Sequence, residues 1–275
     1  MPVRKESNGH RSVQAEVEVP GTPEAVWEAI ATGPGISAWF VPAEVEGRAG
    51  GQTVCHFAPD GSMDSVARIT EWQPPHRFVA ETEEGPGVVG TEWTVEATAG
   101  GTCTVRVVHR WFAESDDWDG QFEGHAVGWA SFFKILRLYL EHFPGQKSAL
   151  LPLAAQHDGS VAEAFGRLMD PLGIVQGAQG QAIKPTADLP ILTGTVLEVQ
   201  DYSPHGFSVI LKLQRPAPGI AHLIGFPIGG PVHISVRFYL YGPEASAVAA
   251  EVEAAWQAWL GARFPTGPRN GEGGH

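Results

Sequence analysis

The sequence is poor in cysteine and has no long apolar run. Its only cysteines, Cys55 and Cys103, lie 48 positions apart, so they form no CxxC motif and no disulfide-dense framework. No stretch approaches the roughly 18 apolar residues of a membrane span. The N-terminal MPVRKESNGHRS is charged but lacks the apolar segment of a signal peptide. We therefore expect a cytoplasmic location, reduced cysteines and no membrane partner.

Basic residues are also scarce. The chain has 18 Lys and Arg against 31 Asp and Glu, for a formal net charge of −13. Affinity for nucleic acids depends mainly on Lys and Arg that neutralise phosphates, so we expect no nucleic-acid partner. The glycine pairs match neither a dinucleotide fingerprint nor a phosphate loop, and no His pair has zinc-ligand spacing. We therefore expect no cofactor and no metal.

What the sequence does contain is a series of strand patterns closed by one long helix. Residues 13–19 alternate apolar and polar side chains, as a strand buried on one face does. Thr22 and Pro23 are typical of a helix start, and Gly33-Pro34-Gly35 predicts a break before a short helical piece at 36–40. Steps of three and four between apolar residues predict a helix from about Trp118 to Phe143. The strands predicted between them are Ala43–Glu46, Gln52–Phe57, Met63–Trp72, Arg77–Glu83, Gly90–Glu96 and Thr102–Phe112.

This order indicates an α+β fold in which a curved antiparallel sheet grips a long C-terminal helix. Three segments resemble the SRPBCC superfamily, which has the START and birch-pollen-allergen-like helix-grip fold: VEVPGTPEAVWEAIATGPGISAWF (17–40), VARITEWQPPHRFVAETE (66–83) and VGWASFFKILRLYLEHFPG (127–145). Within it, the sequence is similar to bacterial homologues of the C-terminal domain of the activator of the heat-shock-protein-90 ATPase. The resemblance covers residues 13–145.

The second half repeats landmarks of the first in the same order. AEAF (162–165) followed by Gly173-Ile174 echoes PEAVW (23–27) followed by Gly35-Ile36, and YSPHGF (202–207) echoes QPPHRF (73–78). Both halves end in a Trp-containing helix that closes on Phe-Pro. Charge differs between them: residues 1–146 hold 21 acidic and 10 basic residues, whereas residues 147–275 hold 10 and 8.

These landmarks predict two tandem helix-grip copies, and an unrelated second domain remains the alternative. We expect a disordered tail at 1–12, a first domain at 13–146, a diverged second domain at 147–265 and a second disordered tail at 266–275. Because it holds two Trp against seven in the first, the second domain is expected to support the first or to mediate contact with a protein partner or a homodimer.

Strand alternation predicts which side chains face the space between sheet and helix. The inward side chains expected are Phe78, Ala80 and Thr82, then Trp93 and Val95, then Cys103, Val105, Val107, His109 and Trp111. Two interpretations remain open, a plain aromatic core and an apolar ligand pocket. The candidate ligand-binding residues are Trp39, Phe57, Phe78, Trp93, Val107, His109, Trp111, Phe122, His125, Trp129 and Phe133.

His109 is the candidate catalytic residue, because it is a titratable side chain predicted to face inward. It could equally be a satisfied core histidine or orient a ligand oxygen, and His125 could be its neighbour. The resemblance implies a protein that holds a small hydrophobic molecule. The alternatives are an enzyme resembling polyketide cyclases and aromatases, with His109 as acid or base, and a chaperone-interaction module. Whether any reaction is catalysed stays open; an enzyme would be cyclase- or dehydratase-like, without metal or nucleotide.

Overall fold

The computed structural model describes residues 3–5, 9–57, 61–84, 87–113, 119–227 and 230–265. Of residue 84 and residues 119–127 it describes the backbone only. The chain divides into two compact units, Met1–Lys147 and Ser148–His275, called unit 1 and unit 2 below. Among the described residues, no helix is both long and apolar enough to span a membrane.

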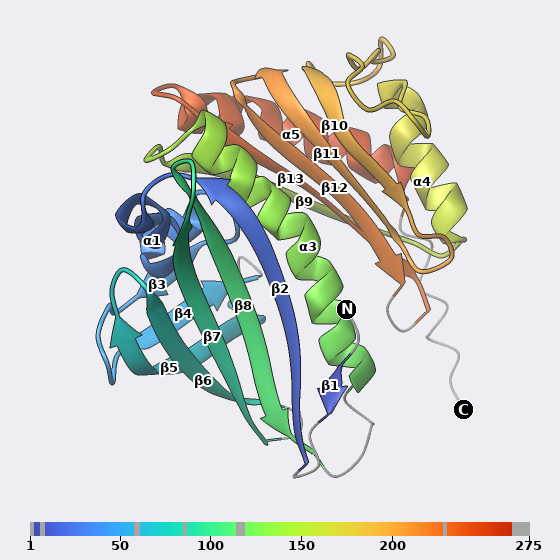
Figure 1. Ribbon diagram of the computed structural model, residues 1–275. Helices are drawn as coiled ribbons and strands as arrows, with labels where there is room; N and C mark the ends of the chain where they lie inside the picture. Colours follow the sequence, from blue (N-terminus) through green and yellow to red (C-terminus); the bar gives the residue numbers. More distant parts are fainter. Residues whose placement is uncertain are drawn as a thin grey trace, which may run out of the picture. The chain divides into compact units, whose positions relative to one another are not determined.

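Unit 1 is one antiparallel sheet that curves around a long helix (Figure 1). Along the sheet the strand order is β1-β2-β8-β7-β6-β5-β4-β3, so the first long strand pairs with the last. The elements are β1 (Arg4–Lys5), β2 (His10–Pro20), α1 (Pro23–Ala31), α2 (Gly33–Ser37), β3 (Ala43–Val45), β4 (Gln52–His56), β5 (Asp64–Gln73), β6 (Arg77–Glu84), β7 (Gly87–Thr98), β8 (Thr102–Phe112) and α3 (Asp119–His142).

The two short helices form where the sequence predicts them. The Thr22 hydroxyl accepts a hydrogen bond from the backbone N–H of Ala25 and caps α1, with Pro23 in the first turn. Thr32 ends α1 and caps α2, accepting from the N–H of Gly35 at 3.0 Å. A Cβ at position 35 would collide with the carbonyl oxygen of Glu28, so glycine is required at this break.

The N-terminal segment differs from the expectation of a disordered tail at 1–12. Residues Arg4–Lys5 pair with residues 11 and 12, and β2 begins at His10. Arg11 is buried, and its Nε–H donates to the carbonyl oxygen of Ala113 at 3.2 Å. Composition alone does not predict this order, because it depends on β8 running to Phe112 and offering backbone partners to residues 10–12. The expected tail at 266–275 lies outside the described residues.

Unit 2 repeats the design with fewer strands. Its elements are β9 (Ser148–His157), α4 (Val161–Met169), a 3₁₀ turn η1 (Asp170–Leu172), β10 (Thr193–Asp201), β11 (Phe207–Arg215), β12 (Gly219–Pro227), β13 (Val232–Tyr241) and α5 (Ala245–Arg263). The sheet order is β10-β11-β12-β13-β9, so the first strand again pairs with the last, and a helix again follows. The predicted fold class, an α+β helix-grip architecture in two tandem copies, is confirmed.

A buried apolar cluster fills most of the space between the sheet and helices of unit 2. Side chains from all five strands and from α4 and α5 form one buried apolar cluster. The ring of Trp256 on α5 lies 4.8 Å from that of Phe238 and 5.5 Å from that of Trp259, both edge-on. The core of this unit is therefore closed by aromatic packing between α5 and the sheet.

Candidate functional site

Unit 1 encloses a cavity of about 650 Å³ between its sheet, α1, α2 and α3. This volume is within the range of roughly 300–1,000 Å³ typical of small-molecule sites. The cavity is lined by Ile30, Ile36, Trp39, Phe40, Thr53, Cys55, Phe57, Met63, Asp64, Ser65, Ala67, Phe78, Ala80, Thr82, Val89, Thr91, Trp93, His109, Gly128, Trp129 and Phe132. Below, these residues are called the wall.

Six of the predicted ligand-binding residues belong to the wall: Trp39, Phe57, Phe78, Trp93, His109 and Trp129. Val107, Trp111 and Phe133 are buried without lining it. Trp111 packs with Val13, Val89 and Ala113, while the Phe133 ring lies 5.9 Å from that of Trp93 and supports it. The side chains of Phe122 and His125 lie outside the described part of the chain.

Sequence reasoning missed several wall residues for which a signal existed. The alternation that turns Trp93 inward also turns Val89 and Thr91 inward when it is followed back along β7. Ala80 and Thr82 were predicted to face inward and do line the cavity, although they were not named as site residues. Phe40 and Phe132 had no such signal, because α2 is too short for a helical period and Phe132 lies beside the predicted stripe of α3.

Aromatic rings dominate the wall. Phe40 is central: its ring centroid is 4.6 Å from that of Phe132, 5.1 Å from that of Trp129 and 5.6 Å from that of Phe57. Trp93 meets Trp129 edge-on at 5.1 Å. Such offset and edge-on pairs hold one another in fixed orientations, so the cavity has a largely preformed apolar surface.

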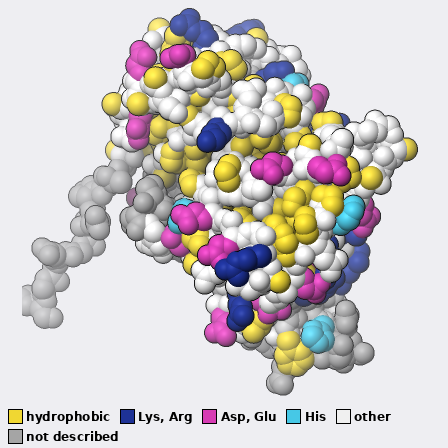
Figure 2. Space-filling view, turned by 90° about the vertical axis from the view of Figure 1, so that its left-hand side faces the viewer, with side chains coloured by type: hydrophobic (Ala, Val, Ile, Leu, Met, Phe, Trp, Pro, Cys, Tyr) yellow, Lys and Arg dark blue, Asp and Glu magenta, His cyan; other side chains and the backbone are white. Residues whose placement is uncertain are grey.

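The cavity reaches the surface near β4 and β5. Phe57 is 40% exposed and Met63 is 64% exposed, although both are wall residues. Figure 2 shows exposed hydrophobic side chains among acidic and basic ones on one face of the molecule. At this side of the cavity, Asp64 Oδ1 lies 2.9 Å from His56 Nδ1, so a hydrogen-bonded polar pair borders an otherwise apolar opening.

His109 is held by two hydrogen bonds to neighbouring side chains. Trp129 Nε1 lies 2.8 Å from His109 Nε2, and Thr91 Oγ1 lies 3.0 Å from His109 Nδ1. An indole N–H can only donate, so Nε2 must accept and carries no proton. The imidazole is then neutral with its proton on Nδ1, which donates to Thr91. In this arrangement Nε2 is occupied and is not poised to take a proton from a ligand.

Cys55 also lines the cavity, but its thiol is chemically quiet. Burial raises the pKa of the Cys55 thiol to about 11, so the sulfur stays protonated and weakly nucleophilic near neutral pH. Among the described residues, no group of three or more His, Cys, Asp or Glu side chains is arranged to hold a metal ion. The Cys55 thiol therefore offers no thiolate nucleophile to the cavity near neutral pH.

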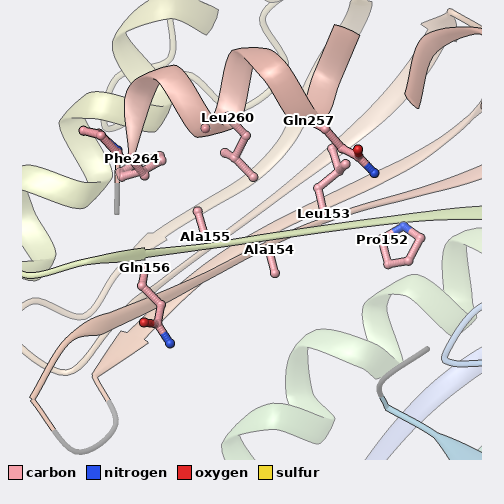
Figure 3. A pocket seen from close by; sticks show the side chains of 10 residues that line it. Pro152, Leu153, Ala154, Ala155, Gln156, Gln257, Leu260 and Phe264 are labelled. Carbon is pink, nitrogen blue, oxygen red and sulfur yellow. The ribbon is translucent and has the colours of Figure 1, made fainter. Parts of the chain in front are cut away.

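Unit 2 has a pocket of its own, of about 540 Å³, between β9 and α5. Figure 3 shows the side chains of Leu153 and Ala155 pointing from β9 toward the side of α5, where Leu260 and Phe264 lie. The remaining lining residues are Pro152, Ala154, Gln156, Gln257, Gly261 and Pro265. None of the lining residues is titratable, so this pocket offers no acid, base or charged anchor. A protein partner or homodimer contact through unit 2 stays a prediction.

Comparison with known proteins agrees with the architecture. Residues 10–135 match the model of a family described as "Polyketide cyclase / dehydrase and lipid transport". A search of curated proteins finds no match. Solved structures similar to the chain include DynU16 from the dynemicin biosynthetic locus, at 17% identity over 90% of this chain and 95% of that one, with a TM-score of 0.42.

Two further solved structures are similar to the chain. The di-domain ARO/CYC BexL from the BE-7585A biosynthetic pathway is 12% identical over 94% of this chain and all of its own, with a TM-score of 0.43. The Aha1 dimer from Colwellia psychrerythraea is 18% identical over 49% of this chain and 98% of its own, with a TM-score of 0.41. The family match to residues 10–135, with the helix-grip topology, supports the resemblance of the first unit to the SRPBCC superfamily.

Proposed function

We propose that unit 1 binds a small hydrophobic molecule in the cavity between its sheet and α3. The observation that carries this proposal is a cavity of about 650 Å³ whose wall is aromatic and aliphatic with a few polar groups. This is the usual composition of a small-molecule site, in which apolar contacts supply affinity and a few polar groups fix orientation. A solid core would instead have favoured the chaperone-interaction alternative.

Native mass spectrometry of the purified chain tests the proposal directly. We expect a small molecule that co-purifies with the chain, or else uptake of an added hydrophobic fluorophore such as 1-anilinonaphthalene-8-sulfonate. In Ala80→Phe the chain should no longer bind either one. Ala80 is a buried wall residue on β6, so a phenyl ring there would occupy the cavity. The matched control is Ala130→Phe, since Ala130 is exposed on α3. Equal uptake by both variants and the parent chain would contradict the proposal.

A cyclase- or dehydratase-type enzyme is the second candidate, because the matching family includes such proteins by its description. His109→Ala separates the two. An enzyme that uses this imidazole as acid or base should lose turnover altogether, whereas a binding protein should only retain its ligand more weakly. The hydrogen bond from Trp129 to His109 Nε2 supports the binding protein, because an acid-base role would require that bond to break.

A further inference from the structure

Few polar side chains face the cavity. Thr53, Asp64 and Ser65 belong to β4 and β5, near the opening, where Asp64 is hydrogen-bonded to His56, and Thr82 lies on β6. Thr91 and His109 lie on β7 and β8, where they are direct partners across the ladder. Directly opposed residues bring their Cβ atoms within about 5.5 Å, which places the Thr91 hydroxyl beside the imidazole.

Trp129, His109 and Thr91 form a relay of two hydrogen bonds, and the indole N–H of Trp129 at one end fixes the direction of both. Trp129 donates to His109 Nε2, the His109 proton therefore sits on Nδ1, and Nδ1–H donates to Thr91 Oγ1. Within the described part of the chain, His109 is the one side-chain hydrogen-bond partner of the Thr91 hydroxyl. Thr91 thus accepts from His109 and keeps its own O–H for another partner.

We propose that Thr91 is the specificity-determining residue of the cavity, and that its hydroxyl donates a hydrogen bond to a carbonyl-type oxygen on a flat apolar ligand. This inference rests on the proposed function of unit 1. His109 and Trp129 act as positioning residues, because they fix which way the Thr91 hydroxyl donates without having to touch the ligand themselves. The ligand class follows from the chemistry of the wall. Aromatic rings favour a planar hydrocarbon frame, and a hydroxyl whose donating direction is fixed favours an accepting oxygen such as that of a ketone or quinone.

A matched pair of fluorescent probes tests the assignment. The ketone is 6-propionyl-2-(dimethylamino)naphthalene, whose emission moves to longer wavelength when its carbonyl accepts a hydrogen bond, and the control is the 6-propyl analogue without the oxygen. In Thr91→Val the ketone should bind roughly three- to tenfold more weakly, the loss of one hydrogen bond, with a shift of its bound emission to shorter wavelength. The propyl probe should bind the variant as it binds the parent chain.

Two variants control for packing. Thr91→Ser keeps the hydroxyl and should keep the ketone preference. Thr94→Val makes the same change on β7 at a threonine that does not line the cavity and is outside the Trp129–His109–Thr91 hydrogen-bond relay, so it should leave the preference unchanged. If both probes bind but Thr91→Val changes them equally or not at all, the role of Thr91 is overturned while the cavity remains a binding site. If neither probe binds the folded parent chain, the proposed function fails as well.

The relay itself is tested on the unaltered protein. Nitrogen-15 NMR of the imidazole at pH 7.5 should show the His109 proton on Nδ1, and Trp129→Phe should abolish that preference because the indole donor is removed. The same variant should weaken binding of the ketone more than binding of the propyl probe, so that the ketone preference falls. A proton found on Nε2 in the parent chain would overturn the relay.

Discussion

The two units share one topology and differ in what lies between sheet and helix. In unit 1 a wide sheet of eight strands, with α1 and α2 beside it, leaves a cavity with an aromatic wall and polar groups. In unit 2 a sheet of five strands packs against Trp256, Trp259 and the rest of a buried apolar cluster, and the pocket of about 540 Å³ between β9 and α5 has no titratable lining residue. The comparison teaches that the order of the elements, which both units share, does not set the chemistry of the space between sheet and helix; the number of strands and the side chains of the closing helix do.

The largest expected difference comes from deleting one tryptophan in each unit. Trp256 is 3% exposed in a filled core, so Trp256→Ala should cost about 3–5 kcal/mol of unfolding free energy. Trp93→Ala removes a ring that already borders empty space, so fewer contacts are lost and the cost should be about 2 kcal/mol. Denaturant unfolding, with hydrogen exchange to assign each transition to its unit, measures both. Equal costs would mean that the cavity of unit 1 is effectively as well packed as the core of unit 2.

Adding volume should again cost unit 2 more than unit 1. Ala221 on β12 is fully buried in the core of unit 2, and Ala221→Phe should destabilise the unit by about 1–3 kcal/mol through overpacking. Ala80→Phe places the same ring into the cavity, where space exists, and should change stability by less than about 1 kcal/mol. Thermal unfolding of the two variants side by side is sufficient. A heavy cost at position 80 would show that the space cannot accept a ring.

Acid should weaken unit 2 through His222. Burial, with a smaller effect of the Arg237 charge, lowers the pKa of His222 from 6.5 to about 3. The unfolded chain therefore takes up this proton first, so stability is unaffected above about pH 6.5 and falls as pH drops towards 3. At pH 5.5 the expected loss is about 1.4 kcal/mol relative to pH 7.5. Denaturant unfolding at several pH values measures the slope.

His222→Gln is the control for this acid effect. It keeps a hydrogen-bonding side chain next to Ser208, which lies 3.2 Å from His222 Nε2, but it cannot titrate. The acid-dependent loss should then shrink to that of the remaining groups in unit 2. An unchanged slope in this variant would assign the effect to another residue.

Strand periodicity predicted much of the wall, and helix packing explains what it missed. Alternation along β6, β7 and β8 turned Phe78, Trp93 and His109 inward because side chains of a strand must alternate between faces. Alternation cannot predict depth along a face, which is why Val107 and Trp111 are buried beyond the wall. Depth depends on how far α3 stands from each strand, which is a property of the packed tertiary structure.

The relay shows the same limit. Trp129 follows His109 by 20 residues, and their hydrogen bond depends on the angle at which α3 crosses β8. From the sequence, His125, one helical turn before Trp129, could be a neighbour of His109; its side chain lies outside the described residues, so this stays a prediction. The described partner on the same helix is Trp129, and that contact depends on tertiary geometry.

The smallest expected difference concerns the helix that follows the first strand of each unit. In unit 2, Ser160 Oγ accepts from the N–H of Glu163 at 3.2 Å and Glu163 Oε2 accepts from the N–H of Ser160 at 2.8 Å, a reciprocal capping box. In unit 1, Thr22 Oγ1 accepts from the N–H of Ala25 at 3.3 Å, and α1 has no reciprocal capping box among the described residues. Ser160→Ala should therefore cost about 1–2 kcal/mol and Thr22→Ala about 0.5–1 kcal/mol.

Hydrogen exchange of the first-turn amides of α4 and α1 measures these costs locally. Glu163→Ala is the partner variant for the capping box and should cost less than Ser160→Ala, because the hydroxyl cap on the N–H of residue 163 remains. If Thr22→Ala costs more free energy of local unfolding than Ser160→Ala, the start of α1 depends on its cap more strongly than the number of cap hydrogen bonds predicts. The reason would then lie in the wall, because α1 contributes Ile30 to the cavity and fraying from its N-terminus would loosen that contact.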